Sequence, residues 1–135
     1  MNREIRFRAW DSEEFPSKMI YQDDKTEYNK ETYLIEFFKK IQGHNSIIMQ
    51  FTGLKDKNGK EIFEEDIIQG FYENETENGE VYWDNDSASF DIKGVNWMSM
   101  ENLECSNQYY EVIGNIYENP ELLNAIGVEE IKNGN

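Results

Sequence analysis

Residues 47–63 read IIMQFTGLKDKNGKEIF and carry the strongest strand and turn signals of the chain. The first six residues of this stretch alternate, with Ile47, Met49 and Phe51 on one side of the chain, and the apolar pair Ile62-Phe63 closes it. Between the two parts lies Asn58-Gly59. Because both of these residues tolerate positive φ, an Asn-Gly pair between apolar flanks favours a type I′ turn. The stretch therefore predicts two antiparallel strands joined by a tight hairpin.

Alternation of period two also marks the start of the chain. Residues 4–10 place Ile5, Phe7 and Ala9 on one face and Arg6, Arg8 and Trp10 on the other. Further strands are predicted at 19–21, 66–72, 80–83, 89–92, 95–100 and 109–116, with an acidic loop at 73–79. Strands that recur about every ten residues indicate a mainly β (α+β) fold, an antiparallel barrel or sandwich-like sheets.

Two segments have helical features instead. Within residues 30–42 apolar side chains recur at i, i+3, i+4 and i+7, and Gly43 supplies a stop, which predicts one amphipathic helix. Near the end, Asn119-Pro120 places a capping residue before a proline, which predicts a short helix at 120–126. We expect a single domain over 1–127 and a frayed tail at 128–135. The apolar positions of the first helix are Leu34, Phe37, Phe38 and Ile41, and Asn29 is its predicted N-cap.

Charge is distributed unevenly along the chain. Its 135 residues carry 13 basic and 28 acidic side chains, a net charge of −15, and residues 61–135 hold 18 of the acids but only 2 of the bases. General binding to nucleic-acid backbones is excluded, because it requires clustered Lys and Arg that displace counterions.

Targeting features and cysteine content indicate a cytoplasmic protein. No apolar run approaches the roughly 20 residues that cross a bilayer, and no apolar signal-peptide region follows the first residues. The single cysteine, Cys105, excludes an intrachain disulfide and a metal site built on several thiolates. We therefore expect no membrane association.

No group of residues forms a convincing catalytic, cofactor or metal site. The one histidine, His44, follows a helix stop and is interpreted as a surface residue, and Cys105 as a small, partly buried filler. In a chain so rich in acids, groups of carboxylates arise by chance, so we predict no catalytic residue, no cofactor and no metal. The groups considered are Glu61, Glu64, Glu65 and Asp66, and Asp84 and Asp91 with Lys93, whose spacing resembles that of metal-dependent nucleases.

The first strand carries a possible interaction face. Basic and aromatic side chains alternate there, a combination that stacks on bases in other proteins. The alternative is that its arginines pair with the acidic segment, within the chain or across a subunit contact. The members of this face are Arg3, Arg6, Arg8 and Trp10.

Three blocks of the sequence carry a resemblance to a known family. They are REIRFRAWD at 3–11, MQFTGLKDKNGKEIFE at 49–64 and YEVIGNIYENPELL at 110–123. The chain resembles the YopX family of small bacteriophage and prophage proteins. The resemblance implies a phage or prophage origin in a Gram-positive bacterium, a mainly β fold and a homo-oligomer, and it supplies no catalytic residues.

The shared motif residues have structural interpretations. Thr52-Gly53 and Asn58-Gly59 are expected in turns, Gly114 at a bulge or close backbone approach, and Asn119-Pro120 at a helix start. One position departs from the family, which commonly has Glu-Gly-Asp where this chain has Glu64-Glu65-Asp66. A position that favours positive φ is then occupied by Glu65.

Three functions follow from these observations. The leading hypothesis is a non-enzymatic phage accessory protein that oligomerises and binds a host or phage protein, because no catalytic set is evident and aromatic residues suit an interface. The alternative is an acidic mimic of DNA that inhibits a host DNA-binding protein, with the acidic segment 61–111 as its functional surface. The third is a metal-dependent hydrolase built on the carboxylate groups named above.

Overall fold

The computed structural model describes residues 5–13, 16–22, 33–95, 98 and 109–123. Within it the chain forms two compact units, Met1–Phe51 (unit 1) and Thr52–Asn135 (unit 2). The boundary falls inside one strand, at the Thr52-Gly53 motif. A single domain over 1–127 stays a prediction.

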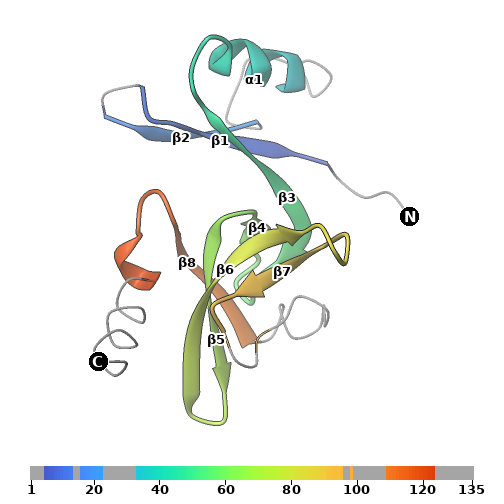
Figure 1. Cartoon of the computed structure of the whole chain (residues 1–135), viewed down its shortest axis with the longest axis vertical. Helices are drawn as coiled ribbons and strands as arrows, with labels where there is room; N and C mark the ends of the chain where they lie inside the picture. Colours follow the sequence, from blue (N-terminus) through green and yellow to red (C-terminus); the bar gives the residue numbers. More distant parts are fainter. Residues whose placement is uncertain (1–4, 14–15, 23–32, 96–97, 99–108, 124–135) are drawn as a thin grey trace. The chain divides into compact units, whose positions relative to one another are not determined.

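The described residues form mainly antiparallel β-structure, as predicted (Figure 1). One sheet has the strand order β2-β1-β3-β4 and the other β7-β6-β5-β8. Among the described residues, no helix has the length and apolar character that crossing a bilayer requires. The elements are β1 (Phe7–Asp11), β2 (Lys18–Tyr21), α1 (Tyr33–Ile41), β3 (Ile47–Lys55), β4 (Glu61–Phe63), β5 (Asp66–Tyr72), β6 (Glu75–Asp84), β7 (Ser89–Lys93) and β8 (Tyr110–Asn115).

In unit 1, α1 covers one face of β1, β2 and β3 (Figure 1). Ala9 lies opposite Ile20 of β2 and Ile48 of β3 in the antiparallel register. Ala9 and Ile20 form a buried cluster with Phe37 and Ile41 of α1. The predicted alternation of β1 is therefore confirmed, because its apolar face is the one beneath the helix.

The helix itself lies within its predicted range. It is observed at Tyr33–Ile41, and Gly43 follows in the left-handed region with φ 83°. This conformation favours glycine because it has no Cβ, so the predicted stop is confirmed. Asn29 and residues 30–32 lie outside the described part of the chain.

The β3–β4 hairpin is confirmed, but its turn differs from the type I′ prediction. Positive φ occurs at Gly59 alone of the Asn-Gly pair, and the amide of Asp56 donates to the carbonyl of Lys60. This is a three-residue loop that ends in a left-handed glycine. The Asp56 carboxylate selects it by accepting hydrogen bonds from the amides of Asn58 and Lys60, each at 2.9 Å.

Thr52-Gly53 does not reverse the chain, contrary to the prediction of a turn. Both residues lie inside β3, where Gly53 has φ 88°. The Thr52 hydroxyl donates to the carbonyl of Ile62 at 2.7 Å and accepts from the amide of Leu54 at 3.2 Å. The motif thus forms a local side-chain turn within a continuous strand.

Unit 2 is built on the β7-β6-β5-β8 sheet, whose buried core includes Ile68, Val81, Ile92 and Val112. The predicted acidic loop at 73–79 is wrong, because β6 begins at Glu75. Glu73 and Asn74, with φ 46° and 68°, form a two-residue turn between Tyr72 and its strand partner Glu75. Positive φ at both positions is the type I′ geometry, and it lets acidic residues continue as a strand.

The closing block has the predicted features. The β5–β8 register shifts between Ile67 and Ile68 opposite Gly114, and a Cβ at Gly114 would collide with the Asn119 side chain. A helical turn begins at Glu121, after Pro120, and its continuation to 126 lies outside the described residues. The tail at 128–135 and most of the strand predicted at 95–100 lie outside them too, whereas Val95 and Met98 are described and are not in a strand.

Candidate functional site

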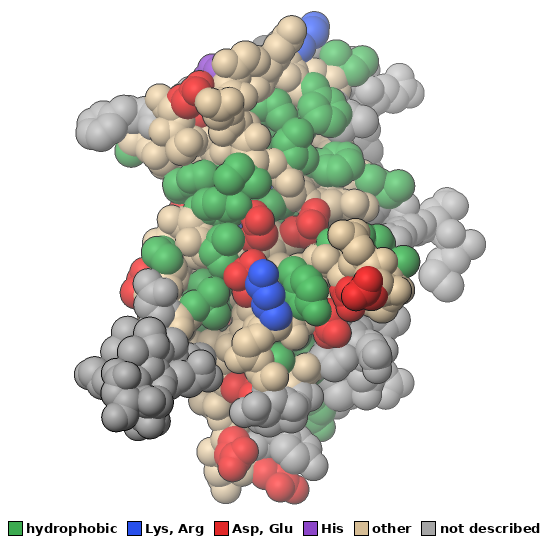
Figure 2. Space-filling view, in the orientation of Figure 1, with side chains coloured by type: hydrophobic (Ala, Val, Ile, Leu, Met, Phe, Trp, Pro, Cys, Tyr) green, Lys and Arg blue, Asp and Glu red, His purple; other side chains and the backbone are tan. Residues whose placement is uncertain are grey.

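The candidate site is an apolar groove on unit 1, called here the α1 groove. Its volume is about 560 Å³, and α1 and the loop that follows it contribute most of its wall. Hydrophobic side chains gather on the surface of this unit, at the top of Figure 2. The groove is lined by Ile35, Phe38, Lys39, Ile41, Gln42, His44, Ser46 and Ile48.

Helix α1 carries more apolar surface than the core of unit 1 covers. Phe37 and Ile41 are buried against the sheet, but Ile35 is 56% exposed and Phe38 is 41% exposed. Burying such a side chain fully is worth about 1.5–3 kcal/mol relative to leaving it in water. Part of that stabilisation is therefore still available to an apolar partner.

Ile48 at the start of β3 extends the same surface. It is 47% exposed and lines the groove beside the helix, whereas Ile47, 43% exposed, lies on the opposite face of the strand. Phe38 also packs against Phe7 of β1, with ring centroids 6.2 Å apart. An exposed apolar group this contiguous, with polar residues at its edge, is typical of a protein-binding surface.

A histidine–carboxylate pair lies at the edge of the groove. His44 Nδ1 is 2.7 Å from the Oδ2 atom of Asp11, whose side chain is buried. The other oxygen of Asp11 accepts the amide of Glu13 at 3.0 Å. An ionised carboxylate only accepts hydrogen bonds, so this contact fits the His44 tautomer that has its proton on Nδ1. Asp11 thereby fixes the orientation of the imidazole where the loop leaves α1.

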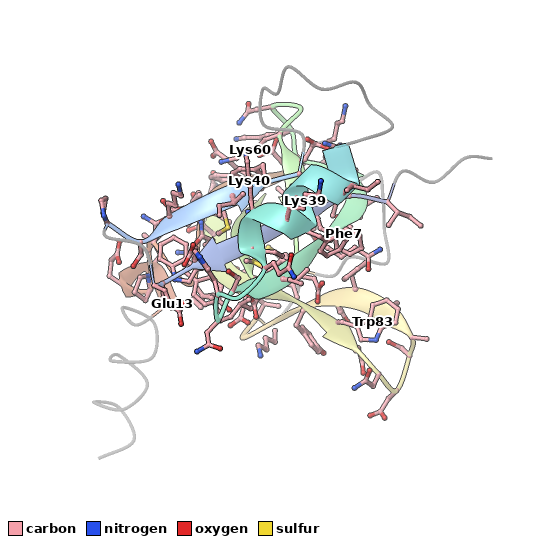
Figure 3. The ribbon with its side chains drawn as sticks, turned by 90° about the horizontal axis from the view of Figure 1, so that it is seen from above. Phe7, Glu13, Lys39, Lys40, Lys60 and Trp83 are labelled. Atoms are coloured by element: carbon pink, nitrogen blue, oxygen red, sulfur yellow. The ribbon has the colours of Figure 1, made fainter. Side chains whose placement is uncertain are left out.

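The last turn of α1 adds basic side chains beside the groove. Lys39 lines the groove and Lys40 follows it in the helix, and both are exposed (Figure 3). Cations are favoured at this end of a helix because its carbonyl groups concentrate negative potential. Within its lining the groove therefore combines an apolar floor with the ammonium group of Lys39 and the polar side chains of Gln42, His44 and Ser46.

The predicted interaction face of β1 is only partly accessible. Arg8 is 2% exposed, and its Nε donates to the sulfur of Met49 at 3.4 Å. The guanidinium of Arg6 lies 4.7 Å from the centroid of the Phe51 ring, and Trp10 is partly buried. Arg3 lies outside the described residues. Arg8 therefore serves packing in this chain, and an interaction role for Arg6 and Trp10 stays a prediction.

The carboxylates at 61–66 have local structural partners. The Asp66 carboxylate accepts from the amide of Phe63 at 2.8 Å, and Glu65 accepts from the Tyr117 hydroxyl at 2.5 Å. Such bonds cap turns and join strands, and they explain acids here without a ligand. Within the described ranges, no three His, Cys, Asp or Glu side chains lie together as a metal-ligand set.

The candidate group Asp84, Asp91 and Lys93 is held by other contacts. Asp84 accepts from the amide of Asp86 and Asp91 from that of Ile92, at 2.9 and 2.8 Å. The Lys93 ammonium lies 3.6 Å from Glu80. On the face of unit 2 seen in Figure 2, the acids occur in separate groups with hydrophobic and basic side chains between them. Within the part of the chain that the structure describes, no observation favours the DNA-mimic or hydrolase hypothesis.

Sequence reasoning missed the α1 groove, although two signals for it were present. Ile35 lies outside the i, i+3, i+4, i+7 stripe of the helix, and Ile47-Ile48 places apolar side chains on both faces of a strand. In both the helix and the strand, there is one apolar residue more than a single covered face requires. The Asp11–His44 contact joins residues 33 positions apart and had no local signal. Cys105 lies outside the described residues.

Comparison with known proteins gives a family and a structural likeness. Residues 6–124 match the family described as YopX protein. The chain is similar to a crystal structure of protein EF1440 from Enterococcus faecalis, with 25% sequence identity and a TM-score of 0.52 over 90% of this chain and 99% of that one. The search of curated proteins gave no match. Neither description names a substrate or a ligand, so the likeness brings no activity to this chain.

Proposed function

The chain belongs to the YopX protein family, and on that premise we propose that it is a non-enzymatic protein-interaction module of a bacteriophage or prophage, acting in the host cytoplasm. The family resemblance supports the phage origin, and the composition of the chain supports the location. The interaction role rests on one observation, the α1 groove with its exposed Ile35, Phe38 and Ile48.

The groove defines the chemistry of its partner. Its apolar floor requires an aliphatic or aromatic anchor on the bound segment, and Lys39 and Lys40 attract carboxylates beside that anchor. Opposite charges across an interface mainly raise the association rate and the selectivity, whereas the buried anchor supplies most of the affinity. The partner is therefore a protein segment with an apolar anchor flanked by Asp or Glu.

The size of the groove sets the strength of the contact. Stable interfaces bury roughly 1,200–2,000 Å² in total, far more than one groove of this size covers. A single bound segment therefore gives a weak and reversible contact. Several copies of the module in one oligomer would strengthen it by linking binding events, which supports a homo-oligomer as part of the proposal.

A selection of displayed random peptides tests the groove directly. The full chain is immobilised, and a parallel selection on Ile48→Glu removes peptides that bind elsewhere. We expect enriched peptides to carry an aromatic or aliphatic residue next to Asp or Glu. Their affinity should fall at least about tenfold for Ile48→Glu, because the apolar floor is lost, and by a smaller factor for Lys39→Glu.

Ile5→Glu is the matched control for this experiment. Ile5 is also an exposed isoleucine of unit 1, 60% accessible, but it does not line the groove. Peptide binding should be unchanged in this variant. If no peptide survives the Ile48→Glu counterselection, or if Ile5→Glu weakens binding equally, the α1 groove is not the interaction site.

A further inference from the structure

We propose that the segment that fills the α1 groove is the β6–β7 hairpin of a second copy of this chain. The inference rests on the proposed function of the groove and specifies its occupant. It is carried by a second exposed group, on unit 2, whose shape and charge complement the groove.

The hairpin presents an aromatic pair beyond the core of unit 2. Trp83 lies opposite Phe90 in the register, and the two rings meet edge to face with centroids 5.0 Å apart. Val81 and Ile92, two positions back on the same face, are buried in the core. Trp83 is 42% exposed, and Figure 3 shows its ring beside the hairpin ribbon. Trp83 is therefore an apolar anchor whose side chain is partly open to solvent.

The charge of the hairpin is opposite to that of the groove rim. Residues 81–92 include Asp84, Asp86 and Asp91 and have no Lys or Arg. Lys39 lines the groove, and Lys40 follows it in the last turn of α1. Hairpin against hairpin or groove against groove would bring like charges together, which disfavours both symmetric arrangements. Hairpin against groove pairs an apolar anchor and carboxylates with an apolar floor and ammonium groups.

The volume of the groove suits a compact apolar group, and the contact has a consequence for assembly. A cavity of about 560 Å³ lies in the range of sites that take a compact apolar group. Because the two surfaces are different parts of the chain, the contact is heterologous. Until a ring closes, an assembly has an unoccupied groove at one end and an unoccupied hairpin at the other. Association therefore gives a ring or a chain of copies.

Analytical ultracentrifugation of the full chain tests the contact, at concentrations from about 5 to about 500 μM because one small contact is weak. The average mass should rise with concentration. Ile48→Glu and Trp83→Ala should each weaken association at least about tenfold, since each removes an anchor. Ile5→Glu should leave it unchanged. Asp86→Lys, at an exposed position of the hairpin loop, serves as a second hairpin variant that removes no packing.

A mixture of the two defective variants tests the contact between the hairpin of one copy and the groove of another. Ile48→Glu keeps an intact hairpin, and Trp83→Ala keeps an intact groove. Each should associate only weakly alone, but together they should form a one-to-one complex that grows no further. Likewise, Asp86→Lys should bind Lys39→Glu more tightly than it binds the unmodified chain, because the opposite charges are restored in exchanged positions.

The outcomes separate this inference from the proposed function. Any one of three outcomes would overturn hairpin docking. They are a mass that stays at one copy, unchanged association of Trp83→Ala, and mixed variants that do not pair. If selected peptides still bind the groove in that case, the interaction module stands and its partner is another protein. If the peptides also fail, the proposed function fails with it.

Discussion

Glu65 has a backbone conformation that glycine adopts more easily, with φ 68°. A side chain in this region costs about 1 kcal/mol. The Glu65 carboxylate offsets that cost because it accepts a hydrogen bond from the hydroxyl of Tyr117, 52 residues away, at 2.5 Å. The departure from the family motif is thus compensated by a contact that glycine could not make.

Substitutions at Glu65 should separate the two effects. Glu65→Ala keeps the strained backbone and loses the carboxylate, so it should lower the free energy of unfolding by about 1–2 kcal/mol. Glu65→Gly loses the same bond but relieves the strain, and it should remain within about 1 kcal/mol of the unmodified chain. Urea unfolding measures both. An alanine variant as stable as the glycine variant would show that the backbone strain is negligible.

Tyr117→Phe is the control for the hydrogen bond. It should cost about 1 kcal/mol in the unmodified chain and almost nothing in the Glu65→Gly variant. Equal costs in the two backgrounds would mean that the Tyr117 hydroxyl stabilises the fold through another contact.

At the scale of elements, one carboxylate joins the β3–β4 hairpin to β8. Asp56 is 3% exposed; Oδ1 accepts from two amides of its own turn, and Oδ2 accepts from the amide of Val112 at 2.9 Å. Asp56→Ala leaves three backbone donors without this partner and should destabilise the chain by about 2–4 kcal/mol. Asp56→Asn keeps the Oδ1 acceptor and should cost about half as much. Urea unfolding gives both values.

Hydrogen exchange at the Val112 amide tests the Asp56 bond to β8 separately from the Asp56 bonds within the β3–β4 turn. The amide of Val112 should exchange faster in Asp56→Asn, because an amide nitrogen cannot accept its hydrogen bond. Asp86→Ala, at an exposed loop position, is the matched control and should change stability by less than about 0.5 kcal/mol. Unchanged Val112 exchange in Asp56→Asn would contradict the proposed link to β8.

The β6–β7 hairpin has its own electrostatic signature. The pKa of Tyr82 lies above its ordinary value of 10.0, first because desolvation disfavours the phenolate and then because Asp84, Asp91 and Asp86 repel it. Alkaline titration at the tyrosinate absorbance band, with Tyr82→Phe subtracted, should show this titration above pH 10. Asp84→Asn removes a repelling charge and should lower that pKa. A Tyr82 midpoint that is unaffected by Asp84→Asn would show that the carboxylate is not a significant neighbour.

Elements with a local signal were predictable, and those fixed by distant contacts were not. The strand at 4–10, the helix at 30–42 and the hairpin at 84–87 follow from alternation, helical spacing and turn residues. Residues 73–79 were misjudged because Glu73-Asn74 makes the tight turn without glycine. The Asn58-Gly59 turn was assigned the wrong type because the controlling group, Asp56, lies outside the pair.

The candidate site was even less predictable from local sequence than the elements were. The sequence predicted the β1 face, but whether Arg8 is buried depends on packing that alternation does not report. The α1 groove arises because β3 places Ile48 beside the helix, a contact between separate elements. Excess apolar residues indicated an open surface, and only the fold showed where Ile35, Phe38 and Ile48 meet.

At the scale of the whole molecule, the charge difference follows the two units. Residues 1–51 hold 8 basic and 9 acidic side chains, a net charge of −1, and residues 52–135 hold 5 and 19, a net charge of −14. Unit 2 is therefore folded against the repulsion of its own carboxylates. Its internal pairs, such as Lys57 with Glu111 and Lys93 with Glu80, offset only a few of them.

Salt should therefore stabilise the chain. Screening lengths fall from about 10 Å at 0.1 M to about 3 Å at 1 M, so repulsion between exposed acids is largely removed. We expect the thermal midpoint to rise by a few degrees between about 20 mM and about 500 mM NaCl. Circular dichroism measures this midpoint at a concentration where the chain is monomeric. The double variant Glu73→Lys and Glu75→Lys changes two exposed residues at the β5–β6 turn and should flatten this dependence. If salt lowers the midpoint of the unmodified chain, attractive ion pairs outweigh the repulsion of unit 2, and its acidic surface contributes net stability.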